Sequence, residues 1–154
     1  MPDKNRDVLT PEGKKFFSEI KKLNKLQVRV GFQQGDEQEE GVDLLDIAMW
    51  NELGTSSSPS RPFMRKSVDE NEEKINAFLN AQVKKLAKGE ATAEQVFKAV
   101  GAFQKGLVQE KIKNGEFEPN SPYTIKKKGS DKPLIDTGTM RQSVNFVITE
   151  KGGK

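Results

Sequence analysis

The sequence predicts an α+β fold: a small, mainly antiparallel sheet with helices packed on one face and long mobile loops. Two observations predict this class. Apolar and polar residues alternate in two segments far apart in the chain, 26–32 and 144–148, as is typical of strands with one buried face. Between them, apolar residues recur at helical spacing in several longer segments. Distant strands with helices between them favour an α+β arrangement.

The first element is a helix that begins at Thr10-Pro11. Thr10 is a typical N-cap, and Pro11 fits the first helical position, where its missing N–H costs nothing. Its apolar stripe runs to about Asn24 and comprises Phe16, Phe17, Ile20 and Leu23. The strand 26–32 follows directly. Within the 154 residues we expect an N-terminal helix in 1–25 that joins the core, one domain over 26–150 and a flexible tail over 151–154.

A short helix is expected over 42–53, ending at Gly54, where a left-handed residue is favoured. The polar loop 55–60 has no large apolar residue, so we expect it to be mobile. Pro62 then begins a long helix that ends at Gly89. The stripe of that helix comprises Phe63, Val68, Ile75, Phe78, Leu79, Val83 and Leu86.

Thr92 and Gln95 form a capping box that begins another helix, which extends to Gly115. Gly101 and Gly106 lie inside this helix at a cost of about 1 kcal/mol each relative to Ala, which suggests close packing at both positions.

The segment 116–133 contains three prolines and the Lys126–Lys128 run, and we expect a long mobile loop there. The strand over 144–148 follows. Weaker patterns in 33–42 and 117–135 leave room for further strands.

Composition excludes several classes of protein. The absence of Cys and His removes disulfides, Cys or His zinc sites, Cys nucleophiles and the Ser-His-Asp triad. The low mean hydropathy of −0.75 indicates a thin core, and no segment has the length of apolar residues that a membrane helix needs. We therefore expect neither a membrane protein nor a secreted one. The net charge of +3 is mild and spread over a mixed surface.

Two patterns resemble catalytic or metal sites. Asp136-Thr137-Gly138 follows two apolar residues, as in the active-site turn of retroviral-type aspartic proteases. Too little chain follows that turn for the all-β protease fold, so we interpret it as a local turn before the last strand. The acidic run 36–46 does not have the spacing of a calcium loop and is interpreted as a solvated segment. We expect no enzyme activity, no metal and no cofactor.

Four segments occur in an informative order: VRVGF (28–32), AMWNELGT (48–55), SRPFMR (60–65) and PLIDTGTMRQS (133–143). This order resembles the tail-completion or head–tail joining proteins of long-tailed bacteriophages and prophages, which are also called minor tail or virion morphogenesis proteins. The resemblance covers roughly residues 26–150. Leu53 stands where that family commonly has an aromatic residue, and Met64 where it usually has Leu.

The resemblance implies a non-enzymatic subunit that forms a ring, typically of six copies, in the virion neck after assembly in the bacterial host cytoplasm. It also implies the partners: further copies, the connector or neck proteins, the major tail protein, and DNA passing through the lumen without sequence readout. The residues of these motifs are the candidates for the assembly interface: Asn51, Glu52, Gly54, Thr55, Arg61, Pro62, Phe63, Arg65, Asp136, Thr137 and Gly138.

Two hypotheses remain open for the Arg-Pro-Phe segment. In one, Phe63 lies in the core while Arg61 and Arg65 are solvated in a lone subunit. In the other, the arginines bind an acidic neighbour, for which the 36–46 run of an adjacent copy is a candidate. A second function also stays open: the basic pI near 9.0 and the Lys126–Lys128 run are compatible with a nucleic-acid-binding accessory protein that contacts the DNA backbone.

Overall fold

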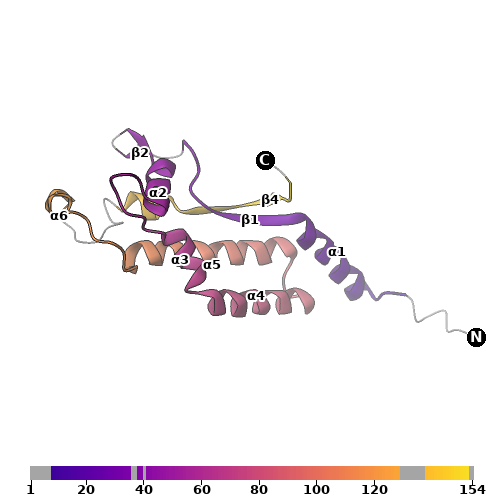
Figure 1. Ribbon diagram of the computed structural model, residues 1–154. Helices are drawn as coiled ribbons and strands as arrows, with labels where there is room; N and C mark the ends of the chain where they lie inside the picture. The colour runs from indigo at the N-terminus through magenta and orange to yellow at the C-terminus, as the bar shows by residue number, and fades with distance from the viewer. Residues whose placement is uncertain (1–7, 36–37, 40, 129–137, 153–154) are drawn as a thin grey trace, which may run out of the picture.

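Helices predominate in the computed structural model, which describes residues 8–35, 38–39, 41–128 and 138–152 (Figure 1). In chain order, the elements are α1 (Pro11–Lys25), β1 (Leu26–Gly31), β2 (Gln38–Glu39), β3 (Val42–Asp43), α2 (Leu44–Leu53), α3 (Phe63–Asp69), α4 (Glu72–Ala87), α5 (Ala93–Asn114), α6 (Pro122–Lys128), α7 (Thr139–Ser143) and β4 (Asn145–Glu150). The predicted α+β class is confirmed.

The two predicted strands pair with each other. β1 and β4 are antiparallel, in a register that runs from Leu26 opposite Glu150 to Gly31 opposite Asn145. Alternation along the strands places Phe146 on the face that packs on α5, where its ring lies against Gly101. The weak pattern before α2 contains a further small hairpin, β2–β3, whereas the described part of 117–135 forms α6 and no strand.

Helix α5 passes beneath the β1–β4 pair and runs through the middle of the molecule (Figure 1). A Cβ added at Gly101 would overlap the Phe146 ring, so the predicted close packing is confirmed there. Among the described residues, apart from neighbouring parts of the same helix, no atom lies within 4 Å of a Cβ added at Gly106, and the same expectation is wrong at that position. A glycine inside a helix is thus required only where another element touches the backbone.

Two separate clusters of apolar side chains lie toward the two ends of α5. The first, here called the Phe63 core, contains Leu44, Ala48, Phe63, Val108, Ile112, Met140 and Val144. The second, here called the Leu86 core, contains Leu86, Ala93 and Val96, with Phe16, Ile20 and Leu23 of α1 packed against it. Phe17 was expected in the same stripe of α1 but is exposed, and its ring meets Phe16 edge-on with centroids 5.5 Å apart.

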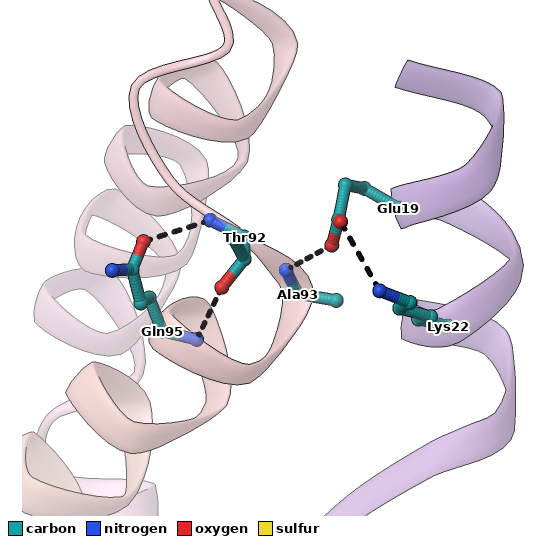
Figure 2. A network of polar contacts seen from close by, with 5 residues as sticks. All are labelled: Glu19, Lys22, Thr92, Ala93 and Gln95. Carbon is teal, nitrogen blue, oxygen red and sulfur yellow. Dashed lines mark hydrogen bonds and ion pairs between the residues drawn. The ribbon is translucent and has the colours of Figure 1, made fainter. Parts of the chain in front are cut away.

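The N-terminus of α5 carries two sets of caps (Figure 2). The predicted capping box is confirmed: the Gln95 N–H donates to Thr92 Oγ1 (3.3 Å), and the Thr92 N–H donates to Gln95 Oε1 (2.9 Å). In addition, the Ala93 N–H donates to Glu19 Oε2 of α1 (2.7 Å), while Lys22 Nζ lies 3.5 Å from Glu19 Oε1. Glu19 therefore ties α1 to the start of α5. Thr10 also caps α1 as predicted, accepting from the Gly13 N–H (3.1 Å).

The prediction of a single helix between Pro62 and Gly89 is wrong. The structure has two helices there, α3 and α4, and Glu70 and Asn71 separate them. The Asn71 side chain donates to the Ser67 carbonyl (3.0 Å), which competes with continued helix formation. Lys111 of α5 forms an ion pair with Glu70 and holds the break against α5. Val68 and Val83, both expected in the buried stripe, are exposed.

The loop expected over 116–133 is also interrupted by regular structure. Pro122 begins α6, and Ser121 Oγ accepts from the Thr124 N–H (3.3 Å), in the manner of an N-cap. Residues 129–133 lie outside the described part of the chain. A proline that breaks a strand pattern can therefore equally well begin a helix.

Candidate assembly interface

The second and third motif segments lie side by side. The Arg61 N–H donates to the Asn51 carbonyl (2.6 Å), and Ser60 Oγ donates to the Glu52 carbonyl (2.7 Å). Gly54 makes the reversal between them possible, because its φ is +78° and a Cβ there would lie 2.8 Å from the backbone nitrogen of Ser60. The end of α2 and the start of α3 thus form one unit.

Glu52 caps α3 from the end of α2. Its carboxylate accepts from the N–H groups of Met64 (2.8 Å) and Arg65 (3.1 Å). Pro62 occupies the N-cap position of α3 and supplies no side-chain acceptor, so Glu52 satisfies donors that would otherwise lack a partner. A negative charge at this place also interacts favourably with the helix dipole. Sequence reasoning had proposed Glu52 as an interface candidate and missed this role.

Arg61 is buried, and the expectation that it is solvated in a lone subunit is wrong. Its residue is only 7% exposed, and its guanidinium donates through Nε to the Glu118 carbonyl (2.8 Å) and through Nη2 to the Pro119 carbonyl (3.4 Å). Burial lowers the pKa of this guanidinium, and the nearby Glu118 carboxylate opposes that effect. A planar, weakly hydrated fork suits such carbonyl acceptors. Arg61 therefore binds its own chain rather than an acidic neighbour.

The other predicted positions of this segment fall as follows. Phe63 is fully buried, as predicted, and its ring meets Phe32 edge-on with centroids 6.0 Å apart. Arg65 is exposed, which confirms the expectation of a solvated side chain. Pro62 is half-buried. Thr55 is exposed, and its N–H donates to the Ser58 carbonyl of its own loop (2.9 Å).

The fourth motif segment is described only in part. Asp136 and Thr137 lie outside the described residues, whereas Gly138 has φ +82° and occupies the N-cap position of α7. Met140 of α7 is buried in the Phe63 core. The helix after the turn was not predicted, because five residues are too few to show a helical period.

All four motif segments therefore contribute to one cluster. Phe32, Ala48, Phe63 and Met140 come from the first to the fourth segment in turn, and each belongs to the Phe63 core or packs against it. Segments that are up to about a hundred residues apart in sequence meet at one end of α5.

One face of α2 stays outside this core. Met49 and Trp50 are each 47% exposed and Leu53 is 71% exposed. Asp46 is exposed as well and lies one turn before Met49 and Trp50, so these side chains share one helical face. We call Asp46, Met49, Trp50 and Leu53 the α2 face. The sequence pattern predicts a helix here without separating its buried side from its exposed side.

The acidic run before α2 contains one residue with a clear structural role. Asp43 caps α2 by accepting from the Leu45 N–H at Oδ1 (2.9 Å), and its Oδ2 accepts from the Gly35 N–H (2.8 Å). Residues 36, 37 and 40 lie outside the described residues. In the part of the chain that is described, no three acidic side chains gather in a way that could hold a metal ion.

Comparison with protein-family models, with curated proteins and with solved structures found no match to this chain. The resemblance to tail-completion proteins therefore depends on the four segments alone. Separately, none of the helices in the described residues has both the length and the apolar character needed to cross a bilayer.

Proposed function

We propose that this chain is a structural virion protein of a tailed phage or prophage, forming an oligomeric ring at the head–tail junction or tail end during assembly. It is not an enzyme in this proposal and needs no cofactor. Its partners are other copies of itself, the connector or neck proteins and the major tail protein, and phage DNA passes through the lumen without sequence readout. It assembles in the host cytoplasm and ends in the virion neck.

The meeting of the four motif segments at the Phe63 core is the observation that supports this proposal most. The proposal requires the four segments to lie together in the fold, since they would be parts of one unit. Here Phe32, Ala48, Phe63 and Met140 pack together although they come from widely spaced segments. The order of the segments in sequence and their proximity in space therefore agree.

The exposed α2 face supports a role in assembly. Exposed apolar side chains that cluster on one face typically mark an interaction site. This cluster lies inside the AMWNELGT segment, next to the Glu52 cap.

Deletion of the gene from the phage or prophage that carries it tests the proposal. We expect filled heads and separate tails in electron micrographs of the lysate, and restoration of joined particles by the gene supplied in trans. Mass spectrometry of purified wild-type virions should detect the chain. Normal joined particles from the deletion strain would refute the proposal.

One observation favours the second candidate, a protein that contacts the nucleic-acid backbone. Tyr123 of α6 is exposed and lies one turn before the exposed Lys126 and Lys127, so an aromatic ring and two cations share a helical surface. A binder that neutralises several phosphates should lose affinity for duplex DNA steeply with salt. Salt titration of DNA binding, with Lys126→Gln and Lys127→Gln together as the variant, distinguishes the candidates: a ring subunit should bind DNA little at physiological salt.

A further inference from the structure

The exposed side of α1 carries apolar and basic side chains together. Phe17 is 51% exposed, and the exposed Lys14 and Lys21 lie one turn before and one turn after it. Gly13 is also one turn before Phe17, and the Leu9 side chain lies over it, with Leu9 Cδ2 3.6 Å from the position of a Gly13 Cβ. We call Leu9, Lys14, Phe17 and Lys21 the α1 face.

The α1 face and the α2 face complement each other. Each consists of large exposed apolar side chains beside charged ones, but the charge of the α1 face is positive and that of the α2 face, from Asp46, is negative. Residues 44–53 contain no Lys or Arg at all. Complementary potential favours the contact of one face with the other and disfavours the contact of either face with itself.

Helices α1 and α2, which carry the two faces, lie toward opposite sides of the molecule (Figure 1). Helix α5, of 22 residues, runs between the Leu86 core near α1 and the Phe63 core near α2, and a helix of that length spans about 33 Å. Faces so far apart on one subunit cannot meet within that subunit. They can meet between subunits.

We propose that the α2 face of one copy of this chain docks on the α1 face of the next. Such a contact uses two different surfaces of each subunit, so it repeats head to tail and produces a ring when the rotation between copies closes. This inference rests on the proposed function, because it names the surfaces through which the copies of the ring would meet. Asp46 would face Lys14 and Lys21, while Trp50 and Leu53 would cover Phe17 and Leu9.

Charge reversal on each face tests the contact. Asp46→Lys makes the α2 face positive, and Lys14→Glu with Lys21→Glu makes the α1 face negative. Each variant alone should self-associate at least about tenfold more weakly than the wild type, because like charges then meet. A one-to-one mixture of the two variants should recover association, since each reversed face meets an unlike partner face on the other variant.

Two readouts follow the association of the full-length chain. Light scattering after size exclusion gives the mass over a concentration series at low salt. Trp50 is the only tryptophan of the chain, so its emission reports on the α2 face alone and should shift to the blue as copies associate. The variant mixture should show this shift, and the separate variants should not.

Matched control variants carry the same charge changes elsewhere. Asp69→Lys reverses an exposed acid at the end of α3, and Lys74→Glu with Lys98→Glu reverses two exposed bases on α4 and α5. These variants should associate like the wild type. Thermal melting of every variant checks that its fold is intact.

Three results would overturn the proposal: a wild type that stays monomeric throughout the series, a reversed variant that associates like the wild type, or a mixture that stays dissociated. If the contact between copies is found but deletion of the gene leaves virions normal, the proposed interface is supported and the proposed virion function is refuted. If deletion blocks head–tail joining, while the charge-reversed variants still associate and still restore joined particles, the proposed function is supported and this interface is refuted.

Discussion

Two helices have a glutamate from an earlier helix at their N-terminus: Glu19 at the start of α5 and Glu52 at the start of α3. In both cases the carboxylate accepts backbone N–H groups, but the burial of the glutamate and the local capping differ. Glu19 of α1 is only 7% exposed and binds Ala93 at the edge of the Leu86 core. Glu52 of α2 is half-buried and binds Met64 and Arg65. The local caps differ too: α5 has the complete Thr92–Gln95 box, whereas the N-cap of α3 makes no side-chain hydrogen bond.

A carboxylate at a helix N-terminus therefore has two different roles in this fold. At α5 the helix start is already capped locally, so Glu19 serves mainly to hold α1 in place (Figure 2). At α3 the long-range carboxylate replaces a local cap that Pro62 cannot supply. Loss of Glu19 should therefore loosen the packing between helices, and loss of Glu52 should loosen the start of a single helix.

The largest expected effect concerns the apolar support of α3. Phe63→Ala should lower the free energy of unfolding by about 3–5 kcal/mol, because a fully buried aromatic ring is replaced by a cavity. Val68→Ala on the same helix is the control and should cost less than about 0.5 kcal/mol, since Val68 is exposed. Urea denaturation measures both. Equal losses would contradict the assignment of Phe63 to the core of the fold.

The second effect concerns the arginines that flank Phe63. Arg61→Ala should cost about 1.5–3 kcal/mol, because the carbonyls of Glu118 and Pro119 lose a charged donor inside the fold. Arg65→Ala should change the stability by less than about 0.5 kcal/mol. Thermal melting of the two single variants checks this contrast. A normal melt for Arg61→Ala would contradict the structural role.

The third effect depends on pH. The hydrogen bond from Ala93 lowers the pKa of Glu19, burial opposes this, and Lys22 adds to the lowering. A lowered pKa in the folded state stabilises the fold above the ordinary value of 4.5, and this contribution is lost as the pH falls through the folded-state pKa. Glu19→Gln should cost about 1–2 kcal/mol at pH 7, because a charged acceptor at the start of α5 becomes a neutral one. The difference from the wild type should shrink below pH 4.5 in urea titrations, and a difference independent of pH would contradict this.

The smallest effect is the most local one. Glu52→Ala should cost roughly 0.5–1 kcal/mol and should speed hydrogen exchange at the Met64 and Arg65 amides, which lose their acceptor. In Glu19→Ala, the Gln95 amide should stay protected, because Thr92 still accepts from it. Amide exchange followed by NMR compares the two. Faster exchange at Gln95 would show that the box depends on Glu19 after all.

The parts of the fold that were predictable have signals local in sequence. The alternation in β1 and β4 and the Thr92–Gln95 box each lie within a few consecutive residues, and all are confirmed. The parts that were missed depend on distant groups. Glu19 meets Ala93, and Arg61 meets carbonyls near Pro119, and a backbone carbonyl has no signature in a sequence.

In the candidate site, too, some features were predictable from the sequence and others were not. The motif order predicted which segments matter, and Phe63 was correctly assigned to the core. The exposed side of α2 was not predicted, because its polar residues Asp46, Asn51 and Glu52 are spread around the helix and leave no amphipathic period that would indicate which face is buried. Only the packing of Leu44 and Ala48 reveals that Trp50 faces outward.

The register of the sheet has a consequence for biosynthesis. β1 pairs only with β4 in the sheet that they form, and Leu26 lies opposite Glu150. At a translation rate of about 5–20 residues per second, roughly 6–24 s pass between the synthesis of β1 and that of β4. During that interval its unpaired edge and the side chains of Val28 and Val30 are available to other strands. Slower translation lengthens this interval and increases the fraction of nascent chains that pair wrongly or aggregate.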